Sequence, residues 1–164
     1  MSTAESRTEL TARPDHGCFG CGEHNPHGLH LVFARQLDDS VAAEFTPRPY
    51  DEGFLGVVHG GIVTTMLDEA MAWAAFANRA WAMTVKLDVR FRRPVEVGVP
   101  LRIVGRLVVN RGRLLETAGE IRRAADDALL AEATGTFMRV SEDQARAWET
   151  RYLGSPEPAM PGVD

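Results

Sequence analysis

The chain has 164 residues and a formal net charge of −5, with 45% hydrophobic and 25% charged residues. This length suits one domain with a core of its own, and the composition is that of an ordinary globular protein. The acidic balance argues against a general nucleic-acid-binding surface, which needs an excess of Lys and Arg. No apolar run is long enough to cross a membrane and the N-terminus lacks the apolar core of a signal peptide, so we expect a cytoplasmic protein that binds neither nucleic acid nor membranes.

The two ends of the chain differ in composition from its middle. Residues 1–16 are polar and show no periodicity, which predicts an N-terminal tail. Residues 17–140 carry regular hydrophobic patterns and form the one expected domain. Residues 141–164 are expected to form a short helix, capped by Ser141, and a Pro- and Gly-rich C-terminal tail.

The first half of this domain predicts a hairpin, a loop and a buried helix. Residues 29–37 and 40–45 alternate apolar and polar side chains around a short acidic turn, as the strands of a hairpin do. Residues 46–56 are rich in Pro, Asp and Gly and are predicted as a loop. Residues 61–77 are nearly apolar on all sides and contain no proline, so they predict a helix that the rest of the protein covers.

Alternation of apolar and polar residues returns after Asn78 and continues to Val140. Four strands are expected there, separated by turns at 96–98, 110–112 and 125–127. One antiparallel sheet of about five to six strands, curled around the apolar helix, satisfies both patterns because each element then covers the other. The predicted fold class is therefore α+β.

Three segments of this pattern resemble those of the hotdog-fold acyl-CoA thioesterases, particularly the PaaI-like branch of phenylacetate degradation. They are VHGGIVTTMLDEAM, VRFRRPVEVGVPL and LLAEATGTFM. The resemblance covers residues 28–140, and CFGCGEHNPHGL just before them is similar to an N-terminal segment of some members. It implies the hotdog fold and the hydrolysis of an acyl-CoA thioester without a cofactor.

His59, Gly60 and Gly61 lie where the loop enters the predicted helix. A helix N-terminus presents N–H groups without intrahelical partners and a partial positive charge, and glycines let a ligand approach this backbone closely. A thioester carbonyl placed there would find donors for the negative charge that develops on its oxygen. The residues alone leave a second interpretation equally open, in which the two glycines only allow a sharp turn and close packing.

Asp68 and Glu69 are carboxylates inside this apolar helix. Burying a carboxylate without a partner is costly, so each must either meet a polar partner or line a cavity where it acts as a nucleophile or general base. Consecutive side chains point about 100° apart around a helix, so a given pocket receives only one of them. The resemblance implies that the catalytic carboxylate is Asp68, eight residues after the first glycine.

The spacing of Gly60 and Asp68 predicts a dimer. Eight residues correspond to about 12 Å along a helix, so one carbonyl cannot touch both groups within a single chain. If two chains pair with their helices antiparallel, the helix start of one lies beside the middle of the other, as the resemblance also implies. We therefore expect a homodimer or a dimer of dimers with the active site across the interface.

Further residues are candidates for the site. By resemblance, Thr84 stands at a hydroxyl position that helps to orient water. His59 is a candidate either to hold the loop or to contact the leaving thiolate, and a structural role is equally open for it. The candidates for substrate binding are Gly61, Arg90 and Arg92. The guanidinium groups of the arginines suit the phosphates of coenzyme A, and a solvated strand face is the alternative for them.

One position departs from the pattern of the family. Some relatives carry Asn or Gln seven residues before the first glycine, where this chain has Gly53. That loop therefore cannot supply a side-chain amide, and Asn25 is a candidate substitute.

Cys18 and Cys21 form a C-x-x-C pair that is followed by His24 and His27, residue types that can hold zinc. The short spacing makes a local site with four ligands cramped, and the chain has no second C-x-x-C element. A redox pair is the other chemical alternative. We favour an ordinary turn near the pocket, so no metal site is predicted.

Together these observations predict an acyl-CoA thioesterase that acts on a medium-chain or aromatic acyl group. Asp68 either activates water or attacks the carbonyl directly, and the sequence leaves both routes open. One alternative is a non-catalytic acyl-CoA binding or sensing protein, which would not need Asp68. A hotdog-fold enoyl-CoA hydratase is a third, but its G-D-x-N-P-x-H arrangement is reduced here to NPHGL.

Overall fold

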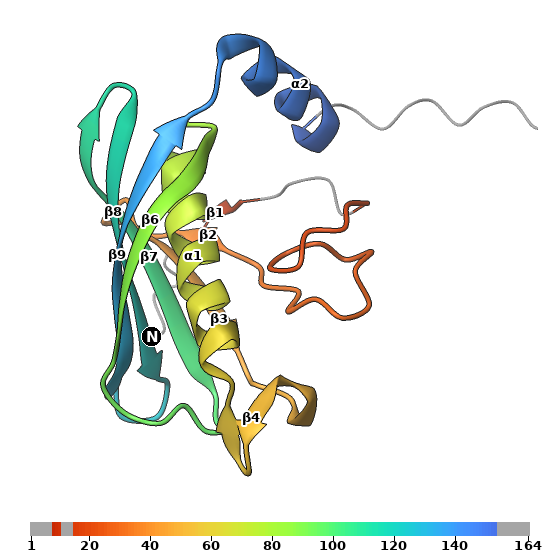
Figure 1. The fold of residues 1–164 in the computed structure, drawn as a ribbon, viewed down its shortest axis with the longest axis vertical. Coiled ribbons are helices and arrows are strands. Elements are labelled where there is room, and N and C mark those ends of the chain that lie inside the picture. Colours follow the sequence, from red (N-terminus) through yellow and green to blue (C-terminus); the bar gives the residue numbers. More distant parts are fainter. Residues whose placement is uncertain (1–7, 11–14, 154–164) are drawn as a thin grey trace, which may run out of the picture.

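The computed structural model describes residues 8–10 and 15–153, in which one sheet packs against a long helix (Figure 1). Seven strands form this sheet in the order β1-β2-β3-β7-β8-β9-β6, and all neighbours are antiparallel. They are β1 (Thr8–Glu9), β2 (Ala34–Arg35), β3 (Val41–Phe45), β6 (Ala82–Phe91), β7 (Leu101–Arg111), β8 (Leu114–Arg123) and β9 (Leu129–Arg139). The other elements are the 3₁₀ turn η1 (Pro49–Asp51), the separate pair β4 (Glu52–Phe54) and β5 (Val57–Val58), and the helices α1 (Gly60–Ala77) and α2 (Glu142–Leu153).

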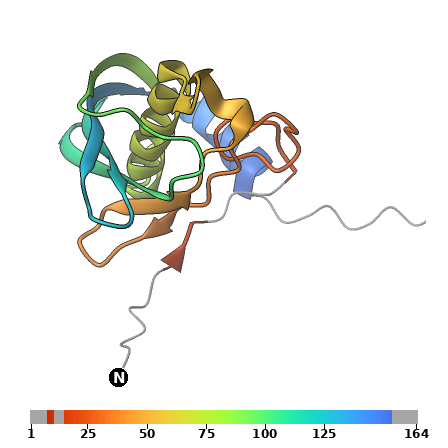
Figure 2. The same cartoon turned by 90° about the horizontal axis from the view of Figure 1, so that it is seen from below.

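The sheet curves around α1, as Figure 2 shows. The predicted α+β hotdog fold is therefore confirmed, including the four long strands that follow the helix. The sheet has seven strands instead of five to six, because the two-residue strands β1 and β2 extend its edge beside β3.

The apolar character of α1 explains its position at the centre of the fold. Met66, Leu67 and Met71 are fully buried between the helix and the sheet. Gly105 of β7 lies against Ala70, and a Cβ atom at Gly105 would come within 2.0 Å of the Ala70 carbonyl oxygen. Glycine at this position is what lets the helix and the sheet approach each other so closely.

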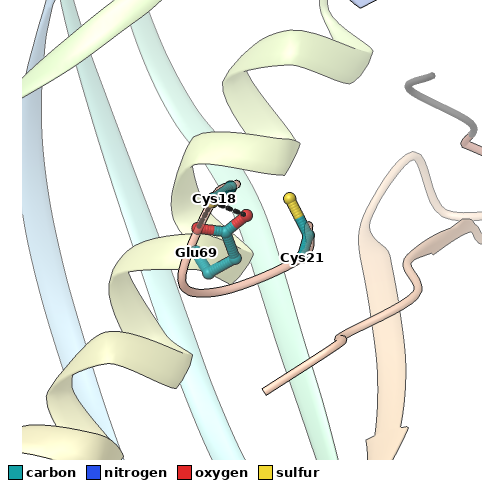
Figure 3. A group of neighbouring side chains, drawn as sticks. All are labelled: Cys18, Cys21 and Glu69. Carbon is teal, nitrogen blue, oxygen red and sulfur yellow. Dashed lines mark hydrogen bonds between the residues drawn. The ribbon is translucent and has the colours of Figure 1, made fainter. Parts of the chain in front are cut away.

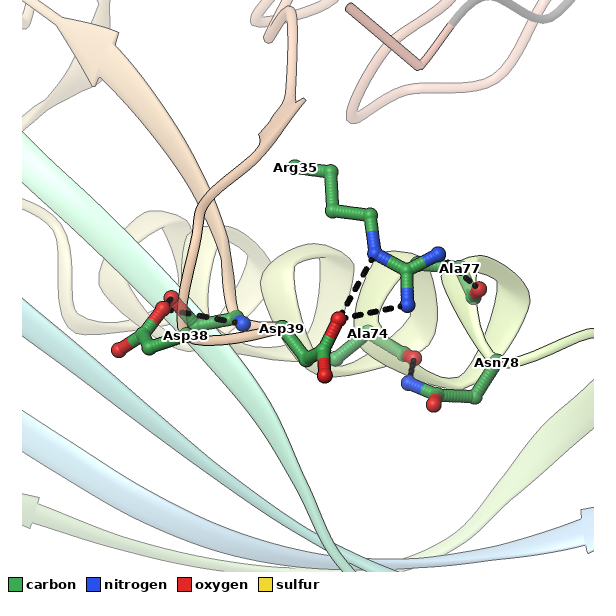
Figure 4. A network of polar contacts seen from close by, with 7 residues as sticks. Arg35, Asp38, Asp39, Ala74, Ala77 and Asn78 are labelled. Atoms are coloured by element: carbon green, nitrogen blue, oxygen red, sulfur yellow. Dashed lines mark hydrogen bonds and ion pairs between the residues drawn. The ribbon is translucent and has the colours of Figure 1, made fainter. Parts of the chain in front are cut away.

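Side chains hold the C-terminal end of α1 (Figure 4). Asn78 Nδ2 donates a hydrogen bond of 2.8 Å to the Ala74 carbonyl, and Arg35 Nη1 donates one of 3.3 Å to the Ala77 carbonyl. A guanidinium group at the negative end of the helix dipole stabilises the helix. Arg35 therefore ties the β2–β3 hairpin to the end of α1.

The segment 46–56 contains more regular structure than the predicted loop. It forms η1 and β4, and β4 pairs with β5 in a hairpin that leads into α1. The sequence missed this hairpin because such short strands show no measurable alternation. Buried Asp51 fixes the segment: its carboxylate accepts a hydrogen bond of 2.7 Å from the Arg48 N–H, and its carbonyl accepts one of 2.8 Å from the His59 N–H.

The two ends of the chain are described only in part. Ser141 caps α2 as predicted, because its Oγ accepts a hydrogen bond of 3.3 Å from the Gln144 N–H. Within the predicted N-terminal tail, Thr8–Glu9 pairs with β2. Residues 1–7 and 11–14 of that tail, and the C-terminal tail from residue 154, lie outside the described residues. In the described part of the chain, no helix combines the length and the apolarity needed to cross a membrane.

Candidate active site

Asp68 lies on α1 and faces the edge strand β6. The Thr84 hydroxyl donates a hydrogen bond of 2.7 Å to Asp68 Oδ1, so the structure brings these two predicted site residues together. A β-bulge between Thr84 and Lys86 makes this contact compatible with the strand. The extra residue lets Thr84 face α1 while Leu87, three positions later, still packs against the core.

The surroundings of Asp68 make its carboxylate a stronger base than an ordinary aspartate. Burial raises the pKa of Asp68 above its usual value, and the hydrogen bond from Thr84 opposes this rise. Among the described residues, Asp68 Oδ2 has no hydrogen-bond partner, and it is not sealed off from solvent. This oxygen can therefore accept a proton from water or attack an electrophile.

The start of α1 provides a backbone donor. His59 caps the helix, because its Nδ1 accepts a hydrogen bond of 2.9 Å from the Gly61 N–H. No acceptor for the exposed Gly60 N–H is found in the part of the chain that the structure describes. A Cβ atom at Gly60 would lie 3.6 Å from the Phe91 ring, an ordinary contact, so the space beside Gly60 is open. Gly60 thus offers the free N–H that an oxyanion requires.

Gly53 lies against His59, where a Cβ atom would come within 2.9 Å of the His59 Cα. The backbone therefore leaves no room for the Asn or Gln that some relatives carry. Asn25 does not take over this role within the chain, because its side chain bonds the Gly17 carbonyl and the His27 N–H in the N-terminal loop.

Arg90 and Arg92 do not lie beside Asp68 within one chain. Val89 packs against the core, so the neighbouring Arg90 faces the opposite side of the sheet, where it is exposed. Arg92 follows β6 and donates a hydrogen bond of 2.9 Å to Glu132.

Glu69 meets the N-terminal loop (Figure 3). Its two carboxylate oxygens lie 3.7 and 3.8 Å from Cys18 Sγ, and Trp73 Nε1 donates a hydrogen bond of 3.1 Å to Oε1. Burial raises the pKa of Glu69 to about 7, and the nearby charge of Cys18 adds to this rise. A hydrogen bond from Cys21 lowers the pKa of the Cys18 thiol to about 5. The sequence did not predict this contact, since 51 positions separate Cys18 from Glu69.

A cavity of about 220 Å³ lies between the second half of α1, the N-terminal loop and α2. Its polar lining consists of His16, Cys18, Cys21 and Glu69, and its large aromatic side chains are Trp73, Phe76, Trp81, Trp148 and Tyr152. Asp68 does not line this cavity, so the cavity and the Asp68–Thr84 pair are separate features.

Comparison with known proteins shows the family to which this chain belongs. The family model of the thioesterase superfamily matches residues 55–130. A phenylacetic acid degradation-related protein of Ralstonia eutropha JMP134 has 30% sequence identity and a TM-score of 0.59, over 67% of this chain and 85% of that one. The chain belongs to the thioesterase superfamily.

Two further members of the superfamily extend this relationship. A thioesterase superfamily protein of known crystal structure has 30% identity and a TM-score of 0.70, over 76% of this chain and 60% of that one. The acyl-coenzyme A thioesterase THEM4 of Xenopus laevis is 30% identical over 111 residues, which are 68% of this chain and 50% of that protein. The chain spans about half the length of the THEM4 proteins that it matches. The resemblance to PaaI-like hotdog thioesterases is thereby confirmed.

Proposed function

We propose that this thioesterase superfamily protein hydrolyses an acyl-CoA thioester to a free acid and CoA. The observation that carries the proposal is the partly buried Asp68 carboxylate, held by Thr84 at 2.7 Å, with its second oxygen available to a reactant. A carboxylate so placed can take a proton from water or attack the carbonyl itself. The name of the Xenopus relative supports acyl-CoA as the substrate class.

A medium-chain or aromatic acyl group is the proposed acid part of the substrate. The name of the Ralstonia relative, which links that protein to phenylacetic acid degradation, favours the aromatic member of this pair.

The proposed site is completed by a second copy of the chain. β6 is an edge strand of 10 residues, and its side chains Met83, Val85 and Phe91 are 51%, 57% and 57% exposed. A long edge strand with an unpaired backbone is a template for pairing with another strand, and the exposed apolar side chains of β6 favour such a contact. Twofold pairing would lay the two α1 helices antiparallel, which brings Gly60 of the partner subunit toward Asp68.

Each site residue then has a defined task. Gly60 of the partner subunit donates its N–H to the carbonyl oxygen as negative charge develops there. In the water route, Asp68 takes a proton from water, the hydroxide adds to the carbonyl, and the CoA thiolate leaves with the electron pair of the C–S bond. In the nucleophilic route, an Asp68 oxygen adds to the carbonyl, the CoA thiolate leaves with the electron pair of the C–S bond, and water then cleaves the resulting anhydride to the free acid and the Asp68 carboxylate. Thr84 holds the carboxylate in position for either route.

The remaining predicted residues serve binding in this proposal. His59 fixes the start of the helix, and Gly61 lets the thioester approach the backbone. Exposed Arg90 meets a phosphate of CoA, and Arg92 adds positive charge beside it.

The test is CoA release from a panel of acyl-CoA thioesters by the wild type and by Asp68→Asn. We expect kcat/KM of the variant to fall roughly 100- to 10,000-fold, because the amide can act neither as base nor as nucleophile. Its thermal unfolding temperature should not fall. The raised pKa of Asp68 means that the charged form costs stability above that pKa, and the neutral amide avoids this cost.

Glu142→Gln is the control, since it removes an exposed carboxylate of α2. This variant should keep wild-type turnover. Wild-type turnover by Asp68→Asn would contradict the role of Asp68. A wild type that binds acyl-CoA and hydrolyses no member of the panel would instead support a binding or sensing protein.

A further inference from the structure

The carboxylate of Glu69 and the thiols of Cys18 and Cys21 form a compact cluster at the wall of the aromatic cavity. One ligand atom from each residue lies within 4.8 Å of the others. The separations of 3.7 and 3.8 Å between Cys18 Sγ and the Glu69 oxygens are close to those of a tetrahedral zinc site. In such a site, metal–ligand bonds of about 2.0–2.3 Å place neighbouring ligand atoms about 3.5–3.8 Å apart.

The N-terminal loop is shaped around the Glu69 carboxylate. A Cβ atom at Gly20 would lie 2.4 Å from the carboxylate carbon, so a larger residue there would displace the carboxylate that the loop covers. The loop is anchored to the core, because the N–H groups of buried Leu29 and Leu31 donate hydrogen bonds to the carbonyls of Phe19 and Gly20. The three ligand atoms are thus held together by the fold and do not meet by chance at a free surface.

The carboxylate is also held from its own helix. Trp73, one turn after Glu69, donates its indole N–H to Oε1 at 3.1 Å. A hydrogen bond of this kind orients a ligating carboxylate and is a regular feature of metal sites.

We propose that Cys18, Cys21 and Glu69 bind a thiophilic divalent cation, with Zn²⁺ as the first candidate. Two thiolates and one carboxylate match the donor preference of zinc, and together they more than offset its charge of +2. Three protein ligands leave one coordination position. Because the three residues line the cavity of about 220 Å³, a water molecule or a small ligand in the cavity can complete the coordination.

This ligand set differs from the local one considered from the sequence. His24 and His27 are exposed and do not belong to the cluster. The third ligand comes instead from the middle of α1. The site does not depend on the proposed thioesterase chemistry, because Asp68 contacts β6 and is not part of the cluster.

The experiment is titration of the reduced, metal-stripped full chain with Co²⁺ and Zn²⁺. We expect one equivalent of metal per chain, with cobalt spectra that show thiolate charge-transfer bands and the intense visible bands of tetrahedral coordination. Cys18→Ser, Cys21→Ser and Glu69→Gln should each weaken the affinity at least about 100-fold, because each removes a direct ligand. Zinc should raise the thermal unfolding temperature of the wild type and leave that of the variants unchanged.

Two controls make the result specific. The double variant His24→Ala/His27→Ala should bind metal like the wild type, and loss of binding there would overturn the proposed ligand set. Asp68→Asn should also bind metal normally while it loses thioester hydrolysis, which separates the two proposals. The metal site is overturned if the reduced wild type binds neither Co²⁺ nor Zn²⁺. It is also overturned if Cys18 and Cys21 form a disulfide under the conditions of the titration.

Discussion

Asp68 and Glu69 are consecutive residues with different partners. A step of about 100° around the helix turns Asp68 toward β6 and Glu69 toward the N-terminal loop. Each carboxylate is therefore stabilised by its own set of contacts, a hydroxyl for Asp68 and an indole for Glu69. In our two proposals, this separation lets one short stretch of α1 serve two chemical purposes.

Thr84 is expected to act as a positioning residue for Asp68. Thr84→Val removes the hydroxyl without a large change in volume, and Thr84→Ser keeps the hydroxyl. A hydrogen bond to a charged group contributes about 1.5–3 kcal/mol, so kcat/KM of Thr84→Val should fall roughly 10- to 100-fold. Steady-state kinetics should show near wild-type activity for Thr84→Ser; equal losses in both variants would contradict the role of the hydroxyl.

The dependence of activity on pH should also reflect the hydrogen bond between Thr84 and Asp68. A protonated Asp68 cannot act, and burial raises its pKa, so activity should decline with falling pH at a higher pH than for an ordinary aspartate. The hydrogen bond from Thr84 lowers this pKa, so its removal in Thr84→Val should move the acidic limb of kcat/KM further toward high pH. An unshifted limb in Thr84→Val would show that the hydroxyl does not act on the ionisation of Asp68.

At the level of elements, the close packing of α1 on β7 holds the site together. Gly105 allows this approach, and a methyl group there would meet the backbone carbonyl of Ala70 at 2.0 Å. At Gly119 of β8 a methyl group would meet side-chain atoms of Leu67 and Met71 at 3.3 Å, and these can move.

These two glycines form a matched pair for a stability test. Gly105→Ala should lower the free energy of unfolding by about 1–3 kcal/mol, because the backbone itself must shift. Gly119→Ala should cost less than about 1 kcal/mol, because flexible side chains can give way. Denaturant unfolding measures both changes, and a larger loss at Gly119 would contradict the packing described for α1.

The sequence predicted the elements that carry strong periodicity. The apolar run of α1 and the alternation of β6 to β9 predicted one antiparallel sheet around a buried helix, and the family resemblance identified this arrangement as the hotdog fold. The β4–β5 hairpin was missed because its strands are too short to show alternation. The contact between Glu69 and the cysteines was missed because it joins distant segments, and no local pattern encodes a tertiary contact of this kind.

At the level of the whole molecule, the proposed function assigns two half-sites to each chain. Gly60 and Asp68 lie on the same helix about 12 Å apart, too far to act on one carbonyl. The exposed side chains of Met83 and Val85 flank Thr84 on β6. In the proposed dimer, a partner that pairs along β6 therefore also comes close to Asp68, which Thr84 contacts.

Gly60→Pro is the variant that removes only the backbone donor. Proline is well tolerated at the first position of a helix, where its missing N–H has no intrahelical partner. The preceding His59 has an extended backbone with φ −59° and ψ 133°, which suits a residue before proline. This variant should keep the wild-type unfolding temperature and lose hydrolysis; Gly60→Ala, which keeps the N–H, should retain much more activity.

Complementation between these two variants tests the shared site most directly. Gly60→Pro and Asp68→Asn chains with different affinity tags are co-expressed, and the heterodimer is isolated and assayed for CoA release. Each homodimer should be inactive, whereas the heterodimer has one site with both defects and one intact site and should show about half of the wild-type turnover. A heterodimer as inactive as the two homodimers would show that Gly60 and Asp68 do not act across the interface.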